Sequence, residues 1–265
     1  MIFNFFRAIL LFIDYLFPLK SIKLKIYLRQ LSENILHKRI GNKKFLFYIE
    51  NYHCFKRYST LMTKEKSTIV WLNRIKQNEV LWDIGANIGI YSLYAAKVRK
   101  ANVFSFEPIV NSARVLKKNI ELNNLQQKIK LFTMGIGSKN KIVKLYYTSN
   151  HAASARHQLK PINKKNLFED IVVFTTDELL KNKILDFPNY VKIDTDGNEI
   201  EILKNSKKIL SSKNLKSLCI ENELGSGENL RKNEIIKILK KYGFAITHVE
   251  NYILGYNMFF EKNIT

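Results

Sequence analysis

The alternation of short apolar runs with stretches of helical periodicity is the main feature of the chain from residue 80 onward. The apolar runs have the length of buried strands, and the segments after them repeat apolar residues every three or four positions. This pattern predicts an α/β fold with a parallel sheet and helical crossovers. The predicted strands cover residues 80–83, 103–107, 129–134, 190–194, 218–223, 244–248 and 257–261, and the predicted helices cover residues 88–99, 110–123, 200–210 and 230–242.

Weaker signals lie between the third and fourth of these strands. Residues 141–147 predict one strand of a hairpin, and Thr175 followed by Glu178 matches a capping box that opens a short helix. Residues 151–168 are polar and irregular, and a loop of this length inside a compact domain is usually functional or disordered. We expect this loop to form a lid over the functional site.

The first 64 residues lack the alternation and predict an N-terminal extension, followed by the main domain over residues 65–265. Residues 3–19 predict an apolar helix that is too short and too charged to span a membrane. Lysines follow it up to residue 25, so residues 3–25 fit a helix that lies on a membrane surface. Packing of this helix against its own domain or against a second subunit fits equally well.

The rest of the extension predicts a second helix and a hairpin. Apolar residues at helical spacing extend this helix to about Lys38. Aromatic residues then crowd between Lys43 and Tyr58, as in a hairpin placed before the main domain. Residues 69–75 predict a short helix that leads into the first strand of the sheet.

Composition and charge narrow the class of protein. The 265 residues are 46% apolar and 12% aromatic, which argues against global disorder. The net charge of +21 invites a nucleic-acid partner, but the lysines are spread along the whole chain, so we do not expect one. Cys54 and Cys219 lie in apolar runs and predict buried, reduced thiols in a cytoplasmic protein, with peripheral contact at the inner face of the membrane if the first helix lies there.

The strand at residues 80–83 ends in Asp83 and runs into a turn that contains Gly85 and Gly89. Glycine permits positive φ angles and the close approach of a ligand, and open parallel sheets bind ligands at such turns. The spacing lacks the middle glycine of the dinucleotide fingerprint. It therefore predicts a ligand without a pyrophosphate, with an ordinary turn between strand and helix as the alternative.

A second acidic strand end follows one β-α unit later, at Glu107. A carboxylate at this position can accept hydrogen bonds from both hydroxyls of a ribose. Two acidic strand ends with no phosphate site fit a nucleoside that carries a cationic amino acid, namely S-adenosylmethionine (SAM). A solvated strand end is the alternative for Glu107.

Three motifs in this order resemble those of FkbM-type SAM-dependent methyltransferases. They are Asp83-Ile-Gly-Ala-Asn-Ile-Gly89, Phe106-Glu-Pro108 and Lys192-Ile-Asp-Thr-Asp-Gly-Asn-Glu199. The resemblance covers about residues 65–260 and implies a Rossmann-like class I methyltransferase fold, with a seven-stranded, mostly parallel sheet and helices on both faces. It implies SAM as the cofactor, with contacts from Asp83, Gly85, Asn87, Gly89, Glu107, Pro108 and Gly135.

The third motif supplies the candidates for catalysis, because the end of its strand faces the methyl group of SAM in this architecture. Methyl transfer to a hydroxyl needs correct positioning and a group that accepts the proton. Crowded carboxylates raise one another's pKa values, which favours such a role. Asp194 is the first candidate, followed by Glu199 and His157. Alternatively, Asp194 only hydrogen-bonds the cofactor and Glu199 caps the following helix.

A metal-assisted reaction is a further alternative. Asp194, Glu221 and Asn222 lie at the ends of predicted neighbouring strands and are similar to the Mg²⁺ ligands of catechol-type O-methyltransferases. The resemblance to the FkbM family itself implies no metal, and we expect none.

The resemblance implies methyl transfer to a hydroxyl of a sugar, a glycan or a related metabolite, so a small molecule or a glycan is the expected acceptor. Two other functions remain open. An RNA methyltransferase would use the positive charge and would bind RNA in a salt-sensitive manner. A membrane-associated protein without catalysis would bind SAM but release no S-adenosylhomocysteine (SAH).

Overall fold

The computed structural model describes residues 11, 12, 15, 16, 22, 34–147, 149, 151–154, 167–181, 185–224, 227–253 and 255–263. The chain divides into two compact units, Met1–Ile35 and Leu36–Thr265, and the second contains every site discussed below. The predicted boundary at residues 64 and 65 therefore falls inside the second unit. Residues 3–25, for which membrane contact is predicted, lie almost entirely outside the described residues. None of the helices in the described part of the chain is long and apolar enough to span a bilayer.

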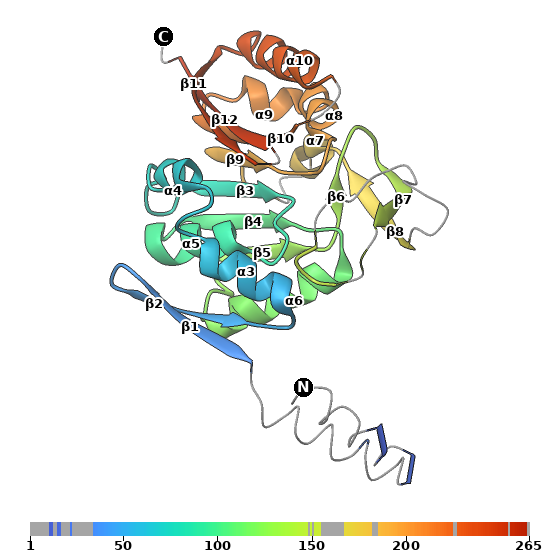
Figure 1. Ribbon diagram of the computed structural model, residues 1–265. Helices are drawn as coiled ribbons and strands as arrows, with labels where there is room; N and C mark the ends of the chain where they lie inside the picture. Colours follow the sequence, from blue (N-terminus) through green and yellow to red (C-terminus); the bar gives the residue numbers. More distant parts are fainter. Residues whose placement is uncertain are drawn as a thin grey trace. The chain divides into compact units, whose positions relative to one another are not determined.

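A seven-stranded sheet forms the centre of the second unit (Figure 1). Its strands are β3 (Val80–Ile84), β4 (Asn102–Phe106), β5 (Ile129–Phe132), β9 (Tyr190–Ile193), β10 (Ser217–Glu223), β11 (Phe244–Tyr252) and β12 (Gly255–Lys262). They lie in the order β11-β12-β10-β9-β3-β4-β5. Neighbours from β10 to β5 are parallel, whereas β12 is antiparallel to both of its neighbours. This order confirms the predicted class I methyltransferase fold.

Helices cover both faces of the sheet (Figure 1). On one face lie α4 (Lys66–Leu72), α5 (Ile90–Arg99) and α6 (Val110–Leu122), and on the other lie α7 (Thr176–Lys181), α8 (Glu199–Lys204), α9 (Lys207–Ser211) and α10 (Glu228–Lys240). All five residues of β3 are buried, with Leu81 in the core of the first face and Trp82 in the core of the second. A parallel strand buried on both faces is nearly continuous in apolar residues, which explains the apolar runs of the sequence.

The N-terminal part of this unit is a hairpin of β1 (Ile35–Ile40) and β2 (Lys43–Tyr48), followed by α3 (Tyr52–Thr60). The prediction of a helix up to Lys38 is therefore wrong at residues 35–38, and the predicted hairpin between Lys43 and Tyr58 contributes only its first strand. Gly41, at φ +56°, begins a tight Gly-Asn turn between the strands. Such two-residue turns are typical of hairpins, and this one was overlooked because the helical spacing of the leucines before it was extended too far.

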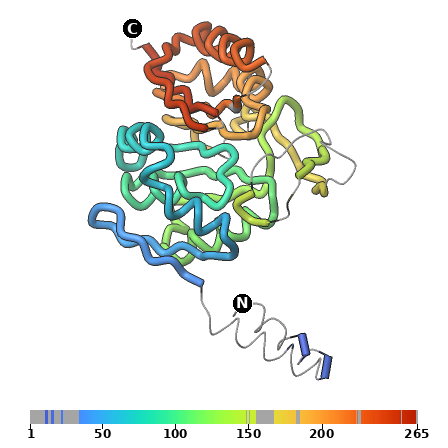
Figure 2. Tube along the Cα trace, in the orientation of Figure 1, coloured from blue at the N-terminus to red at the C-terminus, as the bar shows by residue number. Residues whose placement is uncertain are grey.

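The hairpin and α3 pack against α6 as part of the same core. The tube view shows these segments of the backbone side by side (Figure 2). Asn119 of α6 is fully buried and accepts a hydrogen bond from the backbone N–H of Tyr48 at 2.8 Å. Its amide group donates to the Tyr58 hydroxyl at 2.5 Å and to the Ile88 carbonyl at 3.0 Å. One side chain thus joins β2, α3 and the turn after β3.

A second, three-stranded sheet has the order β6-β8-β7, from β6 (Gly135–Ile136), β7 (Lys141–Tyr147) and β8 (Leu167–Phe174). Strand β7 was predicted as half of a hairpin, and its partner β8 was not located in the sequence. The predicted helix over residues 200–210 is divided into α8 and α9 at Asn205 and Ser206. The hydroxyl of Ser206 donates to the Ile202 carbonyl at 2.7 Å and accepts from Thr176 at 2.9 Å.

Replacing Asn119 with alanine is predicted to destabilise the protein strongly. The Tyr48 N–H and the Ile88 carbonyl would lose their partner inside the core, at a cost of about 1–3 kcal/mol for each unpaired group. We expect the free energy of unfolding to fall by about 3 kcal/mol or more in urea titrations. Lys117→Ala, an exposed change on the same helix, is the control, and equal stabilities of the two variants would contradict this role of Asn119.

Candidate active site

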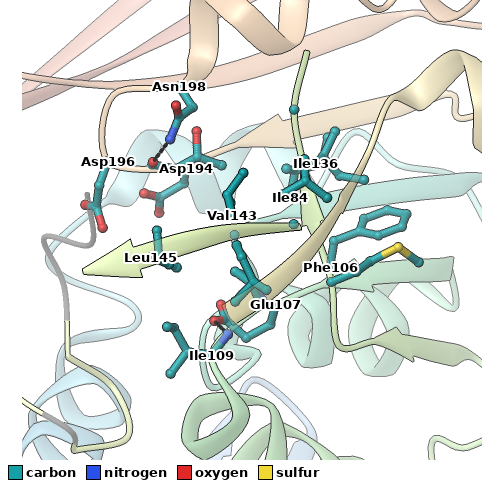
Figure 3. Close-up of a pocket in the computed structure, with 18 of the residues that line it drawn as sticks. Ile84, Phe106, Glu107, Ile109, Ile136, Val143, Leu145, Asp194, Asp196 and Asn198 are labelled. Carbon is teal, nitrogen blue, oxygen red and sulfur yellow. Dashed lines mark hydrogen bonds between the residues drawn. The ribbon is translucent and has the colours of Figure 1, made fainter. Parts of the chain in front are cut away.

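A cavity with about 1030 Å³ of empty space opens at the carboxyl ends of β3, β4 and β9 (Figure 3). Glu107 comes from the end of β4, and Asp194 and Asp196 come from the loop after β9. The opposite wall is one face of the three-stranded sheet and is apolar. Its apolar lining side chains are those of Val143, Leu145, Ile171 and Val173, and Lys141 at the start of β7 also borders the cavity. Alternate residues of a strand point to opposite faces, and accordingly Ile142 and Val172 are exposed on the outer side.

The turn after β3 forms the floor of this cavity. The N–H groups of Gly85 and Ala86 both donate to the carbonyl of Phe106, at 2.9 and 3.0 Å, which ties the turn to the end of β4. Gly85 has φ +81°, and a Cβ atom there would lie 1.8 Å from the backbone oxygen of Asp194. The ends of β3 and β9 can therefore approach only because residue 85 is a glycine.

Glu107 has a fixed position although it borders the cavity. It is 5% exposed, and its carboxylate accepts hydrogen bonds from the backbone N–H groups of Asn87 at 2.7 Å and Ile109 at 2.8 Å. These bonds fix the orientation of the Glu107 carboxylate at the edge of the cavity.

Residues 151–154 join several elements at the edge of the cavity. The Asn87 amide donates to the Ser154 carbonyl at 2.9 Å, and the Arg57 Nε donates to the Ala153 carbonyl at 3.0 Å. Ala152 and Ala153 are buried. The start of the predicted lid is therefore anchored to the core, while residues 155–166, including His157, lie outside the described residues.

Asp194 is paired with a lysine that is buried in the middle of the sheet. Lys192 is 1% exposed, and its Nζ lies 2.8 Å from Oδ2 of Asp194. Burial acts to lower the pKa of Lys192, but the surrounding carboxylates, Asp194 first among them, raise it above its usual value. Burial acts to raise the pKa of Asp194, whereas the Lys192 charge, a hydrogen bond with Glu221 and the charge of Arg57 lower it to about 2. Asp194 is therefore a stable anion beside the cavity.

Glu221 of β10 holds a proton next to this anion. Burial, together with the charge of Asp194 and the hydrogen bond to it, raises the pKa of Glu221 well above its usual value. The hydroxyl of Tyr252 donates a hydrogen bond to Oε1 of Glu221. Asp194 and Glu221 thus form a carboxyl pair that shares one proton, as two neighbouring acids do when both cannot ionise.

Glu65 brings a further carboxylate to Lys192 from the segment before α4. It is 5% exposed and accepts a hydrogen bond from the Tyr91 hydroxyl at 2.6 Å. Burial acts to raise the pKa of Glu65, but Lys192 and Lys64 lower it below its usual value. Glu65 therefore also compensates the positive charge of the buried Lys192.

Asp83 lies beneath the turn after β3 and does not line the cavity. Its Oδ2 accepts a hydrogen bond from the Ser92 hydroxyl at 2.5 Å, and its Oδ1 has no hydrogen-bond partner among the described residues. Burial raises the pKa of Asp83, against the effect of Lys192. This placement suits a residue that orders the turn after β3, and the contact of Asp83 with SAM stays a prediction.

Glu199 is oriented towards its own loop. Its Oε1 accepts hydrogen bonds from the N–H of Thr195 at 3.0 Å, the hydroxyl of Thr195 at 2.9 Å and the N–H of Gly197 at 3.1 Å. The side chain is buried and does not line the cavity. These contacts favour the alternative stated above, in which Glu199 holds the start of its helix, over a direct part in catalysis.

The three predicted Mg²⁺ ligands do not converge. Asn222 donates to the Tyr256 hydroxyl at 2.5 Å and accepts from Arg231 at 3.3 Å. It follows Glu221 on β10, and adjacent residues of a strand point to opposite faces of the sheet. No cluster of three or more metal-binding side chains occurs within the described residues. The cation paired with Asp194 in this structure is the ammonium group of Lys192.

A model of the methyltransferase FkbM domain matches residues 83–246, which is more than half of the chain. The chain belongs to the FkbM methyltransferase family. SAM is the methyl donor of this family.

Two proteins that are similar to this chain in sequence are also methyltransferases. Hexuronic acid methyltransferase AglP of Haloferax volcanii is 29% identical over 143 residues, which make up 54% of this chain and 56% of that protein. Methyltransferase sdnD of Sordaria araneosa is 32% identical over 99 residues, which make up 37% of this chain and 38% of that protein. The chain thus spans only about half, or less, of the length of these relatives.

Solved structures with a similar fold include precorrin-6y C5,15-methyltransferase from Geobacter metallireducens, with a TM-score of 0.47 and 16% identity, covering 77% of this chain and 91% of that chain. TrmK of M. capricolum in complex with SAH gives a TM-score of 0.45 and 15% identity, covering 74% of this chain and 67% of that chain. The strand order of the central sheet, rather than these likenesses, carries the fold assignment.

The cavity of this FkbM-family chain fits the chemistry of SAM. Glu107 offers a fixed carboxylate for ribose hydroxyls, and the backbone at Gly85 and Gly135 lines the cavity. Phe106 and Ile136 provide an apolar surface suited to an adenine ring. These residues are the ones expected to hold SAM.

The predicted site residues fall into three groups in the structure. Those that line the cavity are Gly85, Asn87, Glu107, Pro108, Gly135 and Asp194. Those that lie behind it are Asp83, Gly89 and Glu199, and His157 is outside the described residues. Sequence reasoning overlooked Lys192, Glu65 and Arg57. A lysine between Val191 and Ile193 in an apolar strand was a recognisable sign of a buried cation, whereas nothing local marked the other two.

Gly85→Ala is predicted to disrupt the floor of the cavity. The new Cβ atom would overlap the Asp194 carbonyl, so β3 and β9 would have to separate. Gly41→Ala is a matched control because Gly41 also has positive φ, at +56°, but no atom lies within 4 Å of its Cβ position. We expect Gly41→Ala to cost about 1–2 kcal/mol and Gly85→Ala to cost substantially more in urea unfolding and to weaken SAH binding in calorimetry. Similar losses in both variants would contradict the close approach.

Glu221→Gln is predicted to flatten the dependence of stability on pH. A carboxyl group whose pKa is raised on folding contributes stability below its unfolded pKa, and this stability is lost as pH rises through the folded pKa. The wild type should therefore lose thermal stability as pH rises from about 4.3, and the variant, which stays neutral, should lose less. Melting temperatures from about pH 4 to 8 measure this. Exposed Glu121→Gln is the control, and identical slopes for all three proteins would contradict the shared proton.

Proposed function

We propose that this FkbM-family protein transfers a methyl group from SAM to a hydroxyl group of a sugar, in a glycan or a related metabolite. The main support is Asp194, a carboxylate kept ionised by Lys192 at the edge of the same cavity that Glu107 borders. An acceptor hydroxyl can donate its hydrogen bond to this carboxylate while its oxygen faces the methyl donor. Predicted contact of residues 3–25 with a membrane surface stays a prediction.

Asp194 suits this reaction as a positioning group and a late proton acceptor. SAM supplies a methyl group on a sulfonium, which is a good leaving group. A carboxylate with a pKa of about 2 is too weak a base to deprotonate a free hydroxyl group. The hydroxyl becomes strongly acidic once its oxygen begins to carry the methyl group, so even this weak base can then take the proton. The hydrogen bond with Glu221 and the ion pair with Lys192 hold the carboxylate in place for that step.

A sugar acceptor is supported by the similarity to AglP, whose name describes a hexuronic acid methyltransferase. That similarity covers 54% of this chain. The sugar that we propose for this chain is accordingly an acidic one, such as a uronic acid residue of a glycan.

The proposal is tested by incubating the protein with tritiated SAM and a panel of neutral and uronic-acid-containing oligosaccharides, with bulk RNA as a further acceptor. We expect label in a sugar fraction. Label in RNA alone would contradict the proposal in favour of an RNA methyltransferase, and SAH binding with no labelled product would favour a binding protein.

Asp194→Asn is predicted to lower the turnover number by about a hundredfold or more, the usual loss when a positioned proton acceptor is removed. Binding of SAH, measured by calorimetry, should change much less and shows whether the variant is folded. Unchanged turnover with intact SAH binding would rule out the role of Asp194.

A further inference from the structure

Arg57 is a charged residue of the cavity that none of the motifs predicts. It belongs to α3, outside the seven-stranded sheet, and lines the cavity together with Asn87 and Asp194. Its Nε donates to the Ala153 carbonyl at 3.0 Å, which fixes the plane of the guanidinium. An element of the N-terminal hairpin region thus delivers a fixed cation to the ligand space.

Among the described residues, no carboxylate forms an ion pair with the terminal nitrogens of this guanidinium. None of the ion pairs formed by the described residues includes Arg57, and Asp194, whose pKa the charge of Arg57 helps to lower, is paired with Lys192 at 2.8 Å. Arginine carries five donors and always keeps its charge, and a half-buried cation is normally compensated by an anion. The bond to Ala153 uses one donor, so the remaining fork is available to a ligand.

We propose that Arg57 binds a carboxylate group of a ligand in the active-site cavity. The planar fork of arginine matches a carboxylate through two parallel hydrogen bonds, which a lysine cannot form. The position is preorganised, because Ala153 lies in the segment 151–154, which Asn51 and Asn87 also anchor through hydrogen bonds to Ala152 and Ser154. Preorganisation lowers the cost of binding.

Two ligands of the proposed reaction carry such a group, so this inference deepens the proposed function and rests on it. One is the amino-acid end of SAM, and the other is an acidic sugar acceptor. Neither ligand has to carry a phosphate group. The experiment below decides which of the two carboxylates Arg57 binds.

The first arm measures calorimetric affinities of SAH and of 5′-methylthioadenosine, which lacks the amino-acid end. Arg57→Gln keeps an N–H donor for Ala153 but removes the charge, and Arg57→Lys keeps the charge but not the fork. Lys56→Gln, an exposed change one residue earlier on α3, is the matched control. If Arg57 binds the carboxylate of the cofactor, Arg57→Gln weakens SAH binding by about tenfold to a hundredfold and leaves the binding of 5′-methylthioadenosine unchanged.

The second arm titrates a uronic acid oligosaccharide, its neutral counterpart and glucose 1-phosphate into the SAH-loaded protein. If Arg57 binds the carboxylate of the acceptor, Arg57→Gln weakens binding of the uronic acid ligand alone by a similar factor, with Arg57→Lys intermediate. Unchanged affinities in both arms, or a loss confined to glucose 1-phosphate, would overturn the inference. A wild-type protein that binds neither adenosine ligand would contradict the proposed function itself, which is a different outcome.

Discussion

The arrangement of the site depends on the buried ammonium group of Lys192. Placing a lysine in the middle strand of a parallel sheet is costly unless the charge is paired. Here the compensation comes from carboxylates on separate elements, namely Asp194 after β9 and Glu65 before α4, while Glu221 on β10 keeps its proton. Because removal of one partner of a buried pair leaves an uncompensated charge, these elements are coupled to one another through Lys192.

This constraint also determines the chemistry of the cavity. Lys192 keeps Asp194 ionised, and the negative charge of Asp194 helps keep a proton on Glu221. Two carboxyl groups of similar intrinsic acidity therefore take different protonation states from their surroundings, as is common where acids meet in an active site. Asp194 is thus a fixed hydrogen-bond acceptor beside the ligand space, and Glu221 is a hydrogen-bond donor behind it.

The N-terminal hairpin and α3 contribute to the site rather than only extending the domain. Asn119 joins the hairpin to the core, and α3 in turn carries Arg57 to the cavity. Residues 151–154 lie between α3 and the turn after β3, so the floor and the edge of the cavity are held by the same set of hydrogen bonds. The ligand space is thus assembled from segments far apart in the sequence.

The sequence by itself determined the alternation of strands and helices, the glycine turn after Asp83 and the acidic end at Glu107. These features are local: the burial of a strand and the φ angle of a glycine leave their mark in consecutive residues. The hairpin was misplaced by one strand because helical spacing and strand alternation compete over short apolar segments.

Only the tertiary structure decided which charges meet. Lys192 and Glu221 come together because β9 lies beside β10 in the sheet, an order that the chain sequence does not state, and Glu65 reaches them from the segment before α4. The same holds for the opposite orientations of Glu221 and Asn222, which separate the predicted metal ligands, and for Arg57, whose partner Ala153 is remote along the chain. Pairing of this kind depends on three-dimensional packing of distant segments, so no pattern within one segment can reveal it.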